Sequence, residues 1–166
     1  MQKYLMVVLI GVFVGILMFI RKKYTSEKGL LKNCKTILSL VITKKKGKEF
    51  SEKYMIKTEI TTKKTYLEKS WVFWEHRTEI TERELKDIAH IIEEEKIKQW
   101  NGFNKIARYA VDGTFWDILV KYQEGGILHA RGYMKYPKDF QKGYSALVEY
   151  LERVITERVE EKRLKE

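Results

Sequence analysis

Residues 70–92 read SWVFWEHRTEITERELKDIAHII, and the hydrophobic period changes in the middle of this stretch. Its aromatic start belongs to an extended segment predicted over 65–77, with aromatic side chains on both faces. At Thr81 the sequence TERE predicts a capping box, in which the threonine hydroxyl binds the backbone of Glu84 and the glutamate reaches back. Four apolar residues then follow at helical spacing and predict an amphipathic helix that ends near residue 96: Leu85, Ile88, Ile91 and Ile92.

Two β-rich segments precede this stretch. Residues 36–43 form an apolar run that is typical of a strand, and the lysines around Gly47 predict a hairpin turn. Residues 54–62 alternate between two faces, which indicates a half-buried antiparallel strand.

The rest of the chain repeats the pattern of strands followed by a helix. Residues 114–122 and 127–133 predict two strands joined by a tight turn. After Pro137, apolar residues at steps of three and four predict a long helix packed across the sheet: Phe140, Tyr144, Leu147, Leu151 and Val154. The fold class expected from this order is α+β, with an N-terminal transmembrane helix, an antiparallel sheet of about five strands and two helices packed on it.

The transmembrane helix is predicted over residues 4–20, which contain no charged side chain and precede three basic residues. A helix rises about 1.5 Å per residue, so this run spans roughly 25 Å, slightly less than a hydrocarbon core. Gly11 and Gly15 have the G-x-x-x-G spacing through which two such helices can pair.

Charge predicts the orientation of this helix. Residues 21–69 hold fifteen Lys or Arg against five Asp or Glu, and the whole chain has a formal net charge of +10. Because basic flanks stay on the cytoplasmic side, we expect a single-pass protein of the bacterial inner membrane with a cytoplasmic domain. The alternative is an exported domain behind a cleaved signal, but bulky and basic residues stand where small residues are needed for cleavage.

The expected organisation is an anchor with its basic flank at 1–23, a tether at 24–35, an α+β domain at 36–158 and a fraying helix end at 159–166. The single cysteine, Cys34, excludes an internal disulfide framework.

Catalytic motifs are missing from the sequence. It has no G-x-S-x-G elbow and no phosphate-binding loop, and its histidines stand apart from other metal ligands. We therefore expect no catalytic residue, no metal and no cofactor, and a protein that is not an enzyme. Dense aromatic residues favour core packing or a binding platform instead. The candidate binding residues are Trp71, Trp74, Trp116, Asp117, His129 and Arg131.

The basic segment after the anchor indicates its partners. Next to a membrane, lysines meet anionic lipid head groups first, so lipid is favoured over nucleic acid, with mere solubility as the alternative. A protein partner is also compatible with the pattern. The candidate lipid-binding residues are Arg21, Lys22, Lys23, Lys44, Lys45, Lys46 and Lys48.

Three short elements within residues 80–155 resemble a small uncharacterised bacterial domain of membrane-anchored and lipoprotein-type proteins. They are W-x-G-F at 100–103, D-G-x-x-W at 112–116 and G-x-x-x-Y-P at 132–137. The lipoprotein cysteine of some such proteins is missing from this chain, and the resemblance implies no established activity.

Two hypotheses of function follow. The first is a membrane-tethered, non-enzymatic binding or adaptor domain. The alternative is a small-ligand receptor or enzyme with a pocket between sheet and helices. A deep cavity where Asp117, His129 and Arg131 converge would favour the second, and a core filled with aromatic side chains would favour the first.

Overall fold

The computed structural model divides into two compact units, Met1–Asn33 and Cys34–Glu166. The structure describes residues 31, 33–47, 50–59, 61–71, 74–109 and 112–165. Because the first unit lies almost wholly outside these residues, the fold is that of the second unit.

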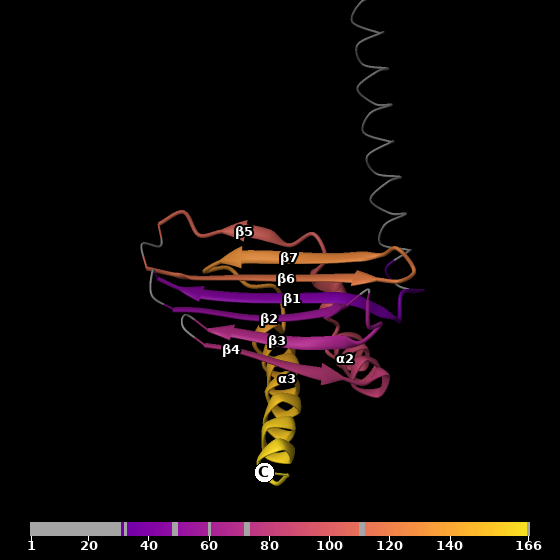
Figure 1. Cartoon of the computed structure of the whole chain (residues 1–166). Coiled ribbons are helices and arrows are strands. Elements are labelled where there is room, and N and C mark those ends of the chain that lie inside the picture. Colours follow the sequence, from indigo (N-terminus) through magenta and orange to yellow (C-terminus); the bar gives the residue numbers. More distant parts are fainter. Residues whose placement is uncertain are drawn as a thin grey trace, which may run out of the picture. The chain divides into compact units, whose positions relative to one another are not determined.

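The second unit is built on one seven-stranded sheet with the order β4-β3-β2-β1-β6-β7-β5 (Figure 1). Neighbouring strands pair antiparallel, except that β5 pairs parallel with β7. The strands are β1 (Ile37–Lys46), β2 (Phe50–Thr58), β3 (Thr65–Trp71), β4 (Trp74–Ile80), β5 (Asn104–Ile106), β6 (Thr114–Tyr122) and β7 (Ile127–Tyr133).

The prediction of about five antiparallel strands is therefore wrong. The segment predicted as one strand over 65–77 is a hairpin of β3 and β4, in which Trp71 is paired with Trp74. No sequence signal marks a turn there, because the residues between the two strands include no Gly, Pro, Asn or Asp. The three-residue strand β5 is too short to show alternation, and its parallel pairing with β7 is set by tertiary structure.

The prediction of an N-terminal transmembrane helix in the fold class is also corrected. Within the described ranges, no helix combines the length and the apolarity that crossing a membrane requires. The predicted span at 4–20, with Gly11 and Gly15, lies outside the described residues. The fold class of the described part is α+β with a mixed sheet.

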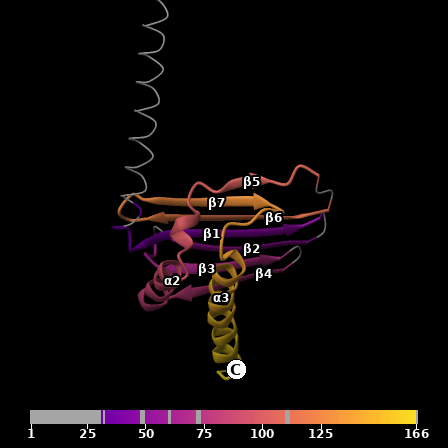
Figure 2. The same ribbon diagram turned by 180° about the vertical axis from the view of Figure 1, so that it is seen from behind.

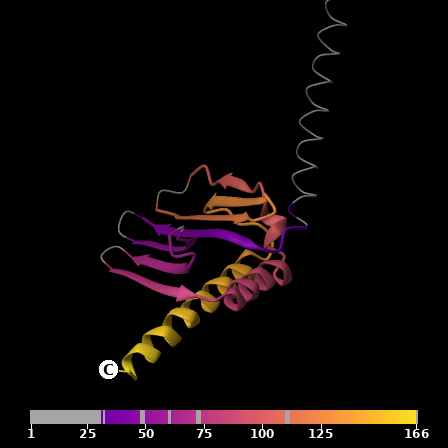
Figure 3. The ribbon, with the colours of Figure 1, turned by 45° about the vertical axis from the view of Figure 1, so that its right-hand side comes forward.

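Two helices, α2 (Glu82–Glu94) and α3 (Phe140–Arg163), lie on the same face of the sheet (Figures 2 and 3). A short 3-10 helix, η1 (Ile97–Trp100), follows α2. Alternate residues of the central strands point to this helix-covered face and form the core, where each fully buried aliphatic side chain contributes about 1.5–3 kcal/mol. The strand side chains that are 0% exposed are Leu40, Ile42, Tyr54, Ile56, Leu67, Ile118, Val120, Leu128 and Ala130.

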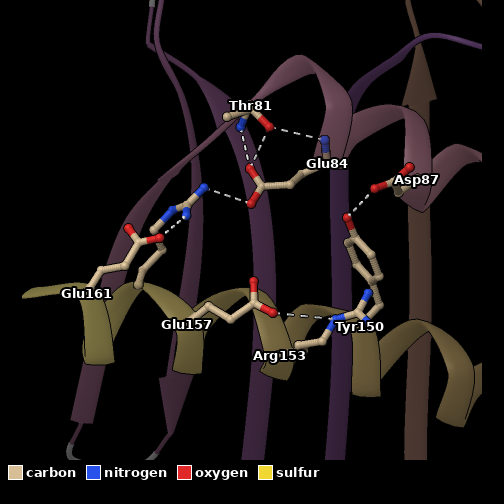
Figure 4. A network of polar contacts seen from close by, with 8 residues as sticks. Thr81, Glu84, Asp87, Tyr150, Arg153, Glu157 and Glu161 are labelled. Atoms are coloured by element: carbon tan, nitrogen blue, oxygen red, sulfur yellow. Dashed lines mark hydrogen bonds and ion pairs between the residues drawn. The ribbon is translucent and has the colours of Figure 1, made fainter.

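The predicted capping box is confirmed and also joins the two helices. The backbone N–H of Glu84 donates to the Thr81 hydroxyl at 3.2 Å, and the Glu84 carboxylate accepts from the Thr81 backbone at 2.6 Å. The other carboxylate oxygen of Glu84 pairs with Arg158 of α3 at 2.9 Å. The Tyr150 hydroxyl of α3 donates to Asp87 of α2 at 2.9 Å (Figure 4). These contacts fix α3 against the first turns of α2.

An aromatic cluster fills the core near the start of α3. The Trp116 ring lies 4.5 Å from the Phe140 ring between centroids, and its Nε1 donates to the carbonyl oxygen of Lys135 at 2.8 Å. Gly132 is the register partner of Trp116 on β7, and a Cβ added there would lie 2.7 Å from the Trp116 Nε1. Only a glycine lets the indole lie so close to the strand.

Candidate binding surface

The second face of the sheet, which we call the open face, carries the other half of the strand residues. No described helix or loop covers it, and Figure 3 shows both helices on the opposite side. Strand register aligns its side chains in rows that run across the strands. One row, the apolar row, contains Met55, Val41 and Leu119, which are successive register partners on β2, β1 and β6. All three side chains are partly exposed.

An ion-pair group borders the apolar row on the β3 side. Glu68, the register partner of Met55, is only 6% exposed. Its carboxylate contacts Lys57 Nζ at 2.8 Å and Arg77 Nε at 3.6 Å, so its buried charge is compensated. The Arg77 guanidinium also lies 3.7 Å from the centre of the Tyr66 ring. These charges satisfy one another and hold the β2–β3–β4 part of the open face together.

A second polar group borders the apolar row on the β7 side. His129, the register partner of Leu119, has its Nε2 3.2 Å from Asp117 Oδ2. Arg131, the register partner of Asp117, donates from Nε to Asn104 Oδ1 at 3.1 Å. The imidazole side chain is 45% exposed, so this group faces solvent rather than a closed pocket.

Cations that no described carboxylate neutralises lie on both sides of the apolar row. Lys53 lies two residues before Met55 on β2, and Lys121 lies two residues after Leu119 on β6. Neither ammonium group forms an ion pair within the described part of the chain. Two residues along a strand span about 7 Å, so the row that contains Lys53 and the row that contains Lys121 are about 14 Å apart. The open face therefore has an aliphatic centre with one lysine outside any described ion pair on either side, and the row of Lys53 also contains the carboxylates of Asp117 and Glu75.

The structure places the predicted binding residues at three different locations. Asp117, His129 and Arg131 lie together on the open face, on two paired strands. Trp116 is 1% exposed and belongs to the aromatic cluster on the helix-covered face. The remaining two tryptophans, Trp71 and Trp74, are register partners on that same face, at its edge, and are 48% and 49% exposed. Trp74 stacks on His76, with ring centroids 5.6 Å apart.

The described lysines of the predicted lipid site do not share one face. Lys44 points to the helix-covered face, where its Nζ lies 5.4 Å from the centre of the Tyr144 ring. Lys45 points to the open face beside Phe115, its register partner, and Lys46 is exposed at the strand end. Side chains alternate along a strand, so consecutive lysines are separated. The remaining predicted residues, Arg21, Lys22, Lys23 and Lys48, lie outside the described residues.

Sequence analysis missed the residues at the centre of the open face. Their signal was present in the alternation of 54–62, which placed Met55 and Lys57 together on one face. A single strand does not show which of its faces the helices will cover, so this pattern alone did not mark a surface.

Comparisons with protein-family models, with curated proteins and with solved structures give no match. The resemblance drawn from the short motifs receives no support from them. In the described ranges, no group of three or more His, Cys, Asp or Glu side chains is placed to hold a metal ion.

Proposed function

We propose that the second unit is a non-enzymatic binding domain and that its open face binds an amphipathic helix with acidic flanks, supplied by a partner protein. The observation that carries this proposal is the aliphatic row Met55–Val41–Leu119, uncovered by any described segment, with the cations Lys53 and Lys121 on either side of it. An exposed apolar patch with a polar rim is typical of an interaction site.

The dimensions of the surface support a helix as the occupant. An α-helix with its side chains is about 10–12 Å wide, so it fits between the rows of Lys53 and Lys121, which are about 14 Å apart. An apolar stripe on the helix would contact the apolar row, while carboxylates on each side of the stripe would reach Lys53 and Lys121. Such a helix would lie across the strands, as α3 does on the other face (Figure 2).

The composition of the open face favours a protein over a nucleic acid. Its centre is aliphatic, whereas bases bind by stacking on exposed aromatic rings. Tyr66 is already covered by Arg77, at 3.7 Å. Methionine and aliphatic side chains, in contrast, adapt well to the apolar stripe of a helix.

Binding is favoured over catalysis at this surface. The Asp117–His129 pair is the obvious candidate for proton transfer, but the half-exposed imidazole lies on an uncovered sheet face. A catalytic pair needs a site that surrounds the substrate and excludes water, and the described neighbours of His129 do not form one. The pair is better explained as part of the polar rim.

The proposal is tested with two matched peptides and the full chain. Both peptides are 18-residue helices with one leucine stripe; glutamates flank the stripe in one and lysines in the other. Fluorescence anisotropy should show that the glutamate peptide binds at least about tenfold more tightly at low salt, because only its charges complement Lys53 and Lys121. The double variant Lys53→Glu/Lys121→Glu should reverse this preference.

The control variant is Lys138→Glu, which makes a charge change of the same kind at an exposed residue away from the open face. It should bind the glutamate peptide as the unchanged chain does. Equal binding of the two peptides would contradict the proposal, and so would tighter binding of an 18-nucleotide single-stranded DNA than of either peptide.

A further inference from the structure

A separate cleft lies where α2 begins beside the ends of β1, β2, β3 and β4. Its volume is about 780 Å³, within the range of about 300–1,000 Å³ that is usual for small-molecule sites. Ile37 and Ile80 form part of its lining and are 3% and 5% exposed, and Leu85 from the first turns of α2 also lines it. The inner part of the cleft is therefore apolar.

The rim of the cleft carries an excess of positive charge. Four lysines and two glutamates line it, but Lys64 and Glu79 neutralise each other in an ion pair at 2.7 Å. The other three lysines, Lys35, Lys63 and Lys86, form no ion pair with a described carboxylate, and only Glu82 opposes them. The rim thus has three available cations against one carboxylate.

Hydroxyl-bearing side chains also line the cleft. The hydroxyls of Thr58 and Thr65 lie 2.9 Å apart and line the cleft with Thr81. The Thr81 hydroxyl is already used to cap α2, whereas the Thr58–Thr65 pair retains acceptor and donor capacity. The lining thus combines buried apolar side chains with hydroxyl groups and exposed cations.

From this combination of buried apolar and exposed cationic side chains we infer that the cleft binds a small amphipathic anion, with its apolar body against Ile37, Ile80 and Leu85 and its anionic head at Lys63 and Lys86. A neutral lipid chain would leave the cations unused, and a free inorganic anion would leave the apolar lining exposed to water. The head group is a carboxylate or a phosphate monoester, since both are held by lysines as point charges. This site is independent of the open face and of the helix proposed to bind there.

The inference is tested by titrating the full chain with four probes: decanoate, decyl phosphate, decanol and inorganic phosphate. Calorimetry measures affinity, and amide NMR shifts of Thr65, Thr81 and Gln123, which line the cleft, locate binding. Decanoate or decyl phosphate should bind at least about tenfold more tightly than decanol and than inorganic phosphate, and the tighter of the two identifies the head group. Decanoate, decyl phosphate and decanol each contain ten carbon atoms, so they differ mainly in the head group.

The variants Lys63→Gln and Lys86→Gln should each weaken binding of the anionic probe by up to about fivefold, as expected for partly exposed charge pairs. The loss of affinity in these variants should be smaller at high salt, because salt screens the charge pairs. Lys138→Gln, outside the cleft, is the matched control and should bind the probes as the unchanged chain does. The apolar N-terminal run is the same in every variant, so probe binding to it does not affect the comparison between variants. Any one of three results would overturn the inference: equal binding of decanoate and decanol, unchanged affinity in the Lys63→Gln/Lys86→Gln double variant, or amide NMR signals of Thr65, Thr81 and Gln123 that do not shift.

Discussion

Two buried tyrosines lie between the sheet and α3. Replacing each of them with phenylalanine should change the free energy of unfolding in opposite directions. Tyr54 on β2 is 0% exposed, and its hydroxyl contacts two carboxylates, Glu52 at 2.8 Å and Glu152 of α3. Lys69 pairs with both carboxylates. Tyr144 on α3 is 5% exposed, and its hydroxyl has no hydrogen-bond partner among the described residues.

The substitution of phenylalanine for each tyrosine keeps the ring and removes only the hydroxyl. At Tyr54 this change removes hydrogen bonds to charged acceptors, which are worth about 1.5–3 kcal/mol, and Lys69 then compensates Glu52 and Glu152 alone. At Tyr144 it removes a buried polar group whose desolvation, at about 1–3 kcal/mol, is not repaid by a hydrogen bond. We therefore expect Tyr54→Phe to lower the free energy of unfolding and Tyr144→Phe to raise it.

Urea unfolding of the full chain at pH 7 measures both changes, and an unchanged m-value checks that the unfolded states are comparable. Tyr122→Phe is a second test of the same reasoning, because the Tyr122 hydroxyl is also buried without a described partner. The reasoning is refuted if Tyr144→Phe destabilises the chain by about 1 kcal/mol or more, or if Tyr54→Phe leaves its stability unchanged.

Two further outcomes are expected. Four tyrosines have their pKa raised above the ordinary value of 10.0, first of all because burial disfavours the charged phenolate; they are Tyr54, Tyr122, Tyr144 and Tyr150. Their stabilising contribution is complete below about pH 10 and is lost above it, by up to about 1.4 kcal/mol per pH unit for each group. The free energy of unfolding should therefore fall once the pH rises above about 10, and each Tyr→Phe variant should make this fall smaller. Gly132→Ala should destabilise the chain by about 1–3 kcal/mol and change its tryptophan fluorescence, since the added methyl would clash with the Lys135 carbonyl oxygen and lie 2.7 Å from Trp116; an unchanged melting temperature would contradict this.

The local parts of the fold were predictable because their signals lie within a few residues. The capping box at Thr81 and Glu84, and the apolar stripe from Phe140 to Val154, each specify a helix and the face that it buries. The β3–β4 hairpin and the parallel strand β5 were not predictable, because neither has a local signal. The first lacks turn residues, and the second is held by pairing with β7, about 27 residues farther along the chain.

The candidate site could be predicted in part from strand geometry. Asp117 and Arg131 are register partners across the predicted 123–126 turn, so their proximity follows from the hairpin. The same geometry excludes Trp116 from their group, since adjacent residues of a strand point to opposite faces. The two remaining tryptophans, Trp71 and Trp74, are separated from it because the number of strands and the helix-covered face depend on tertiary structure.

The short motifs that carried the family resemblance have a packing explanation. The Trp100 ring lies 5.3 Å and the Trp116 ring 4.5 Å from Phe140 between centroids. Phe103 and Tyr136 contact Trp116 at 5.7 and 6.4 Å, and Gly132 provides the space for its indole. All three motifs therefore meet in one aromatic cluster, which explains them without any ligand.

Lysines on the two faces of the sheet differ in the contacts that they make, and this difference is the strongest argument for a binding partner. On the helix-covered face, Lys69 pairs with two carboxylates and Lys44 lies over the Tyr144 ring. On the open face, Lys57 pairs with Glu68 at 2.8 Å, whereas Lys53 and Lys121, on either side of the apolar row, have no described carboxylate partner. If the open face were only a solvated surface, nothing would require its uncompensated cations to flank its aliphatic centre. An acidic helix would complete the arrangement, since it would cover the centre and neutralise both flanks at once.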